Sequence, residues 1–112
     1  MRAAQLLESN TADAIVPDLW WYEIRNTLIV GERRSRITPE RTAIFLRHIA
    51  ELPIIVAAAL DEGILLDLAR ETKLSVYDAA YLSLAIQENL PLATLDTALR
   101  AAALSRGIPL LA

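Results

Sequence analysis

The chain has 112 residues and a mass of 12.4 kDa, which is enough for one domain with a core of its own. Hydrophobic residues make up 54% of the sequence and charged residues 22%, a composition that excludes a disordered chain. The absence of cysteine excludes disulfides and thiolate metal sites, and the single histidine excludes two-histidine zinc motifs. The sequence has no apolar run of about 18 residues and no export signal, so we expect a cytoplasmic protein without a membrane segment.

Basic charge is concentrated in one stretch, although the formal net charge of the chain is −3. Five arginines lie between positions 25 and 41, where only two glutamates oppose them. One explanation is that they close a helix, because cations interact favourably with the negative end of the helix dipole. The other is that they contact the phosphates of a nucleic acid, and the candidate residues for this role are Arg33, Arg34, Arg36 and Arg41.

The first half of the chain alternates short apolar runs with amphipathic patterns. We expect a short helix over residues 2–8, a strand over Ala14–Val16, and a helix with Pro17 in its first turn that ends near residue 31. The next helix is expected to have Thr38 as its N-cap and a proline at its first position. Its predicted apolar stripe consists of Ile44, Phe45, His48, Ile49 and Leu52.

The second half repeats the alternation. Strands are expected over residues 54–57, 91–95 and 108–111, and helices over residues 60–68, from Ser75 onward, and over residues 98–105. Short, continuously apolar strands between helices are typical of a parallel sheet that is covered on both faces. The sequence therefore predicts a single α/β domain over residues 1–112, built in three layers around a short parallel sheet of about four strands.

Three acidic residues are expected near the carboxyl ends of these strands, where open parallel sheets bind their ligands. Asp96 follows the strand over 91–95, Asp78 lies three residues inside a helix, and Glu23 lies about 9 Å along its helix from Pro17. Purely local roles remain open, because Asp78 and Ser75 resemble a capping box and Asp96 could cap the next helix. Clustered carboxylates favour a cation among them, and oxygen ligands without imidazole suit Mg²⁺ or Mn²⁺.

The same acids fall within three ordered blocks whose spacing is that of a known family. The blocks are Pro17-x-Leu19-Trp20-x-x-Glu23-Ile24-x-Asn26-x-Leu28, Tyr77-Asp78-Ala79-Ala80-Tyr81-Leu82-x-Leu84-Ala85 and Ala93-Thr94-x-Asp96-x-x-Leu99. Together they resemble the PIN-domain family, and in particular its VapC-like toxin ribonucleases, over nearly the whole chain. The resemblance implies an Mg²⁺- or Mn²⁺-dependent endoribonuclease that cleaves RNA, together with a VapB-like antitoxin whose tail blocks the acidic groove.

The resemblance also implies a role for individual residues. Glu23, Asp78 and Asp96 match three of the metal-binding, catalytic acids of the family. Thr94 matches the small hydroxyl residue two positions before the last acid, and Asn26 matches a frequent polar neighbour of the glutamate.

The chain departs from the family at its N-terminus. PIN domains begin with an apolar strand that ends in an aspartate, and none of the acids before Glu23 matches it; Asp18 comes nearest but aligns with a helix start. We therefore expect an N-terminally truncated PIN-like fold with weakened or lost cleavage. The alternative is a non-catalytic module that binds nucleic acid or an antitoxin. If upstream sequence is missing, the ordinary toxin interpretation applies.

The missing strand also predicts an association between chains. In the family it is the central strand, which here would lie between the strands expected at residues 14–16 and 92–95. Its loss should leave two apolar edges whose backbone groups are unpaired, and such edges favour pairing with another chain. We therefore expect a homodimer, completed by dimerisation or by exchanged segments.

Overall fold

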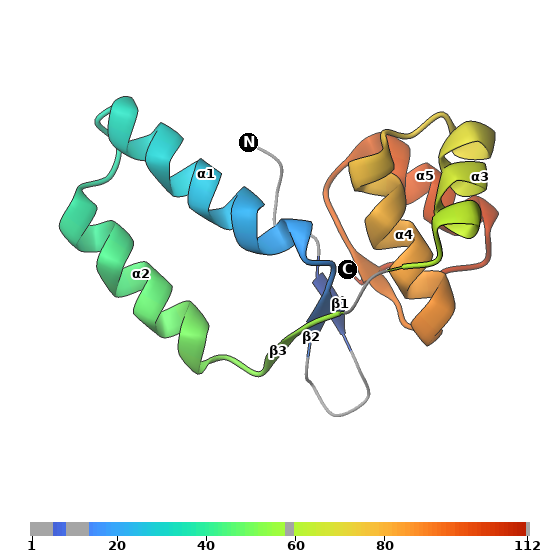
Figure 1. Cartoon of the computed structure of the whole chain (residues 1–112), viewed down its shortest axis with the longest axis horizontal. Helices are drawn as coiled ribbons and strands as arrows, with labels where there is room; N and C mark the ends of the chain where they lie inside the picture. The colour runs from blue at the N-terminus through green and yellow to red at the C-terminus, as the bar shows by residue number, and fades with distance from the viewer. Residues whose placement is uncertain (1–5, 9–13, 58–59, 112) are drawn as a thin grey trace.

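Short strands separated by helices make up the chain, as expected for the α/β class. Figure 1 shows the computed structural model, which describes residues 6–8, 14–57 and 60–111. The strands of this part are β1 (Leu6–Glu8), β2 (Ala14–Val16), β3 (Ile54–Val56) and β4 (Leu92–Ala93), and the helices are α1 (Leu19–Arg33), α2 (Pro39–Glu51), α3 (Glu62–Thr72), α4 (Val76–Glu88) and α5 (Thr97–Ser105). None of the helices in these ranges is long and apolar enough to cross a membrane.

The strands form a mixed sheet in the order β3-β2-β1-β4. β2 and β3 are parallel, whereas β1 is antiparallel to both β2 and β4. β2, β3 and β4 therefore run in one direction and β1 runs against them. The prediction of an all-parallel sheet is wrong in this respect, and the strand expected over residues 108–111 is reduced to a single parallel bridge between Leu92 and Leu110.

The position between β2 and β4, which the sequence predicts to be empty, is filled by β1. Leu7 pairs with Ile15 of β2 and with Leu92 of β4. The helix expected over residues 2–8 is therefore wrong for residues 6–8, while residues 2–5 lie outside the described part. The physical reason is that β2 and β4 carry backbone groups that need partners, and the segment just before β2 can pair antiparallel to it through a short connection. The two unpaired edges expected from the sequence are not formed.

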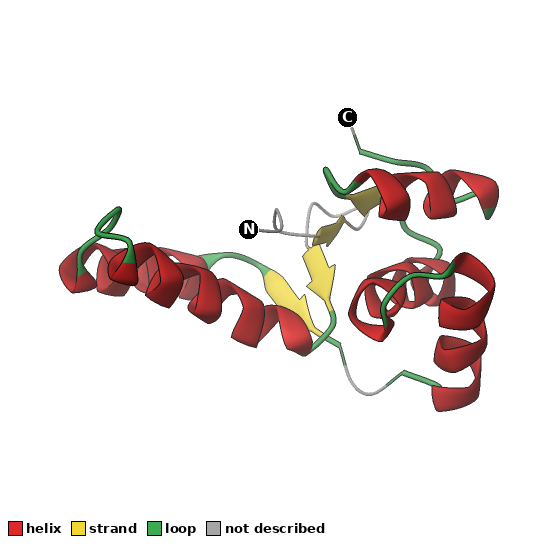
Figure 2. Cartoon of the chain, turned by 90° about the horizontal axis from the view of Figure 1, so that it is seen from above, coloured by secondary structure: helices red, strands yellow, loops and turns green. Residues whose placement is uncertain are grey.

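Helix α4 is the centre of the hydrophobic core. All residues from Asp78 to Ala85 are buried, and α4 contacts α3, α5, β1 and β4. The largest side chains with almost no exposed surface are Tyr81, Leu82, Leu84, Leu92, Leu99 and Val16. Figures 1 and 2 show α3, α4 and α5 gathered on one side of the short sheet.

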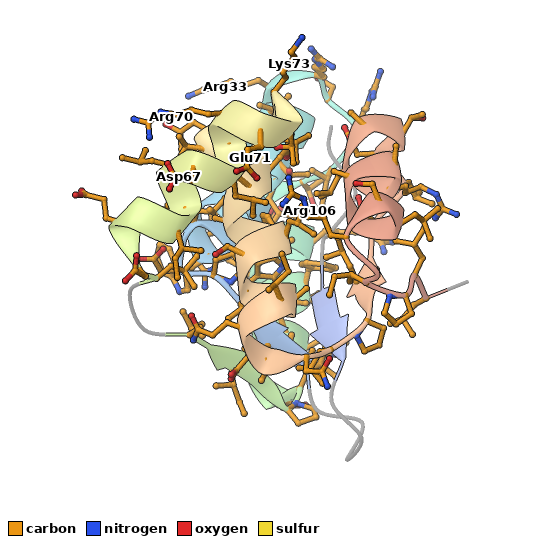
Figure 3. All side chains as sticks on the ribbon, turned by 90° about the vertical axis from the view of Figure 1, so that its right-hand side faces the viewer. Arg33, Asp67, Arg70, Glu71, Lys73 and Arg106 are labelled. Carbon is orange, nitrogen blue, oxygen red and sulfur yellow. The ribbon has the colours of Figure 1, made fainter. Side chains whose placement is uncertain are left out.

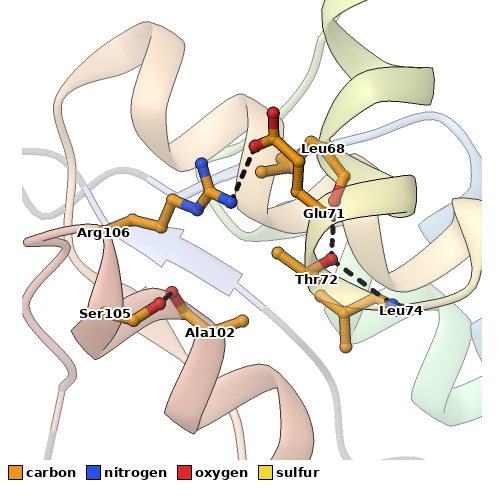
Figure 4. A network of polar contacts seen from close by, with 7 residues as sticks. All are labelled: Leu68, Glu71, Thr72, Leu74, Ala102, Ser105 and Arg106. Atoms are coloured by element: carbon orange, nitrogen blue, oxygen red, sulfur yellow. Dashed lines mark hydrogen bonds and ion pairs between the residues drawn. The ribbon is translucent and has the colours of Figure 1, made fainter.

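Polar contacts join α3 to α5 at the surface of this group. Arg106 Nη2 lies 2.9 Å from Glu71 Oε2, and Figures 3 and 4 show the two side chains pointing toward each other. At the end of α3, Thr72 Oγ1 donates to the Leu68 carbonyl at 2.7 Å and accepts from the Leu74 amide at 3.3 Å. Because the ion pair is largely exposed, it contributes at most about 1 kcal/mol, and burial of α4 dominates the stability of this group.

Helices α1 and α2 project away from the sheet as a hairpin (Figure 2). α1 buries Trp20, Ile24 and Leu28, but α2 buries none of its residues. In the apolar stripe predicted for α2, Ile49 packs against the core. The exposed members of the stripe are Ile44, Phe45, His48 and Leu52. The neighbouring β3 is also open, since Ile55 and Val56 are about half exposed. The expected three-layer arrangement is therefore incomplete on this side.

Candidate nuclease site

Three strands present their carboxyl ends at one edge of the sheet. β2, β3 and β4 all run toward this edge, because β2 and β3 are parallel and β1 is antiparallel to both β2 and β4. α1 begins just after β2, and Asp96 lies three residues after the end of β4. The sheet topology thus brings Glu23 and Asp96 toward the edge where ligands bind in folds with parallel strands.

Glu23 is held by a tyrosine from a distant part of the chain. It lies on the second turn of α1, next to the buried Ile24, and is itself partly buried. The Tyr81 hydroxyl donates a hydrogen bond to Glu23 Oε1 with an oxygen–oxygen distance of 2.5 Å. Tyr81 is only 1% exposed, so packing within the core fixes its ring. A rigid donor of this kind orients the carboxylate instead of leaving its rotamers free.

Asp78 lies on the first turn of α4 and is buried to 9% exposure. The Ser75 hydroxyl caps the helix by accepting from the Asp78 amide at 3.1 Å, so the predicted helix start is confirmed. Asp78 and Tyr81 are three residues apart on one helix, which places them on the same face. Because Tyr81 binds Glu23, the first turns of α4 bring the Asp78 side chain to the same region as Glu23.

Asp96 is engaged in a local role as well. Its Oδ1 accepts from the Leu99 amide at 2.8 Å and thereby caps α5, as the alternative reading of the sequence predicts. Its own amide donates to the hydroxyl of the buried Thr94 at 3.1 Å, and Arg100 Nη1 donates to the Thr94 carbonyl at 3.0 Å. Thr94 thus fixes the backbone that carries Asp96. Capping uses only one of the two carboxylate oxygens of Asp96.

The acidic residues have suitable donor atoms for a metal ion, but their positions do not form a closed metal site among the described residues. Carboxylate oxygens are the ligands that Mg²⁺ and Mn²⁺ prefer. Among the residues that the structure describes, however, no three acidic or histidine side chains are grouped closely enough to hold an ion. Mg²⁺ retains several waters and is commonly bound through only one or two carboxylates. Glu23 and Asp78 therefore offer the type of donor that a water-rich Mg²⁺ site uses, whereas the described residues form no closed site with three carboxylates.

None of the residues that the structure describes takes the place of the family's first aspartate. β1 lies in the position of the central strand but runs the opposite way, so Glu8 pairs with Ala14 at the start of β2, away from the carboxyl ends. Asp18 is the N-cap residue of α1 and forms no side-chain capping hydrogen bond. Asp18 thus lies at a helix start, as the sequence predicts.

The remaining predicted residues lie outside this cluster. Asn26 is exposed and forms no hydrogen bond with the part of the chain that is described, so the partner of Glu23 is Tyr81 and not Asn26. The four arginines proposed to bind phosphates are all exposed at the tip of the α1–α2 hairpin: Arg33, Arg34, Arg36 and Arg41. Their charges are separated from Glu23 by most of the length of α1.

The sequence matches the model of a known family. The family model described as PIN domain matches residues 1–104, which is nearly the whole chain. No curated protein matches the sequence.

Proposed function

Since the chain belongs to the PIN domain family, a family of nucleases that typically depend on divalent metal ions, we propose that it is a VapC-like endoribonuclease or a descendant of one. The observation that carries this proposal is the Tyr81–Glu23 hydrogen bond, because it joins two of the family's sequence blocks at a partly buried carboxylate. The PIN domain suggests a nucleic acid as the substrate, and we propose RNA.

The proposed reaction is hydrolysis of a phosphodiester bond. The oxygen of a water molecule bonds to phosphorus, the bond to the leaving ribose oxygen breaks, and that oxygen gains a proton. A bound Mg²⁺ or Mn²⁺ ion would lower the pKa of the attacking water and stabilise charge on the phosphoryl group. Glu23 and Asp78 would hold the ion, Asp96 Oδ2 would complete the acidic groove, and Tyr81 and Thr94 would position these groups through the contacts described above.

We also propose that turnover is weak. The family's first acid has no counterpart among the described residues, since Glu8 pairs with Ala14 at the opposite end of β2. The second candidate function is a non-catalytic module that binds nucleic acid or a VapB-like antitoxin in a toxin–antitoxin system. The exposed arginines of the hairpin favour this second function as much as the first, because binding phosphates does not require catalysis.

An RNase assay with Mn²⁺ separates the two functions. We expect slow cleavage by the wild type that disappears in Glu23→Gln and in Asp78→Asn, and that persists in the control Glu40→Gln, an exposed acid on α2. Calorimetry should show weak Mn²⁺ binding that both site variants remove. Cleavage that survives either site substitution would exclude the proposed site, and RNA binding without any cleavage would favour the non-catalytic module.

Two protein partners belong to this proposal. A VapB-like antitoxin would cover the acidic groove around Glu23 and Asp78. A second copy of the chain would cover the open apolar stripe of α2, whose Phe45 is 42% exposed, together with β3. Apolar surface of this kind is typical of interfaces between proteins. The proposed homodimer thus rests on α2 and no longer on unpaired edges of the sheet.

A further inference from the structure

A pocket of about 340 Å³ lies at the tip of the α1–α2 hairpin, away from Glu23, Asp78 and Asp96. The residues that line it include Arg36, Arg41, Ser35 and Thr38, together with the apolar Ile37. The volume is at the lower end of the range for sites that bind small molecules. The pocket is therefore large enough for one nucleotide unit, and its lining combines cations, hydroxyls and an apolar surface.

The cationic groups of the pocket are available to a ligand. The guanidinium groups of Arg36 and Arg41 form no ion pair or hydrogen bond with the described residues, whereas the lining acid Glu32 accepts from the Thr42 hydroxyl at 2.7 Å. Thr38 Oγ1 accepts from the Arg41 amide at 3.2 Å, which leaves its own proton for another acceptor. Within the part of the chain that the structure describes, the lining thus contains two guanidinium groups without a partner and one carboxylate that already accepts a hydrogen bond.

We infer that this pocket binds a phosphate group of an RNA strand, with the attached ribose against Ile37. This inference rests on the proposed function, and it adds a binding site separate from the acids that would cleave the strand. Glu32 follows Glu23 by nine residues on α1, which corresponds to about 14 Å along the helix. For a strand that runs along α1 with the roughly 3.4 Å rise of one strand of a B-form duplex, this length corresponds to about four nucleotides between the bound phosphate and the scissile bond.

The first test measures binding of a ten-nucleotide single-stranded RNA by fluorescence anisotropy, with EDTA present so that no cleavage occurs. The Arg36→Ala/Arg41→Ala double variant should bind at least about tenfold more weakly. For this variant, the slope of log K plotted against the logarithm of the salt concentration should be less steep by about 0.7. The charge-matched control Arg47→Ala/Arg70→Ala removes two exposed arginines outside the pocket and should bind as the wild type does. Circular dichroism should show that all variants are folded.

The control also defines the results that overturn the inference. Equal losses in the two double variants would show that the RNA responds only to overall charge, and unchanged binding in Arg36→Ala/Arg41→Ala would show that the pocket is not used. Inorganic phosphate is a further probe. If phosphate binds the pocket but the wild type does not bind RNA, the pocket is a site for free anions and the inference is wrong.

A second experiment distinguishes an error in the proposed phosphate-binding pocket from an error in the proposed function. With Mn²⁺, kcat/KM is measured on RNAs of three and ten nucleotides. The Arg36→Ala/Arg41→Ala variant should lose activity on the longer RNA only, because the shorter one does not reach from the acids to the pocket. Equal losses on both lengths overturn the four-nucleotide spacing. If the wild type cleaves neither RNA, the nuclease proposal fails, and the anisotropy result alone decides whether the pocket binds RNA.

Discussion

The Tyr81 hydroxyl donates to Glu23 Oε1 at 2.5 Å and joins α4 to α1 across 58 residues of sequence. The contact connects α4, the most buried helix, to the α1–α2 hairpin, which projects away from the sheet. It therefore has two consequences that can be measured separately: it stabilises the attachment of α1, and it fixes the direction of a carboxylate in the candidate site.

Replacement of Tyr81 by phenylalanine removes this hydrogen bond and keeps the buried ring. We expect Tyr81→Phe to lower the free energy of unfolding by about 1–3 kcal/mol, the usual cost of leaving a partly buried carboxylate without its donor. Urea denaturation followed by circular dichroism measures the change. Tyr77→Phe is the matched control, because Tyr77 is 62% exposed and should change stability by no more than about 0.5 kcal/mol. Equal stability of the two variants would contradict a structural role for the contact.

Asp96 has a capping role that the structure shows and a proposed role in the acidic groove, and two substitutions separate them. Asparagine caps a helix about as well as aspartate, so Asp96→Asn should keep the stability of the wild type within about 0.5 kcal/mol. Asp96→Ala should lose about 1 kcal/mol. If Asp96 also supports the groove, both variants should bind Mn²⁺ more weakly in calorimetry. Normal Mn²⁺ binding by Asp96→Asn would restrict the residue to capping.

Local features of the sequence predict local structure well. The hydroxyls of Thr38 and Ser75 cap α2 and α4 at the expected positions, and Gly107 follows α5 with a φ of 73°. These contacts involve neighbours within about four residues, so propensity and spacing determine them. The three acids are likewise found on the expected elements, with Glu23 on α1 and Asp78 on α4.

Contacts between distant segments could not be predicted in the same way. The four-residue spacing of Tyr77 and Tyr81 suggests a pair on one helix face, but Tyr77 is exposed and Tyr81 reaches Glu23 across the core. The direction of β1 depends on which backbone groups of β2 and β4 need partners, which the apolar pattern of residues 2–8 does not reveal. The stripe of α2 shows the same limit, because periodicity identifies an apolar face but not what covers it.

The core around α4 should govern the stability of the whole chain. Leu82 is fully buried on α4, in the helix that contacts α3, α5 and two strands. Leu82→Ala should cost about 2–5 kcal/mol through lost burial and the cavity left behind. A domain of this size has roughly 5–15 kcal/mol of stability in total, so the melting temperature should fall by about 8 °C or more. Differential scanning calorimetry measures this shift, and Leu104→Ala, at a 61% exposed position on α5, is the control that should melt close to the wild type.

The apolar stripe of α2 leads to a prediction about assembly. Phe45 is 42% exposed in the centre of the stripe, so a charge there should cost the single chain no more than about 0.5 kcal/mol. In the proposed homodimer the same charge would be buried without a partner, which is strongly unfavourable. We expect light scattering to give twice the 12.4 kDa chain mass for the wild type and the single-chain mass for Phe45→Asp.

Ala43→Asp is the matched control for this experiment. Ala43 is exposed on the same helix, two residues before Phe45 and therefore on nearly the opposite face. The Ala43→Asp substitution introduces the same charge at almost the same position along the axis of α2 but outside the stripe, so the dimer should persist. A wild type that remains a single 12.4 kDa species at micromolar concentration would contradict the homodimer. Loss of the dimer in Ala43→Asp as well would show that the second copy binds another face of the hairpin.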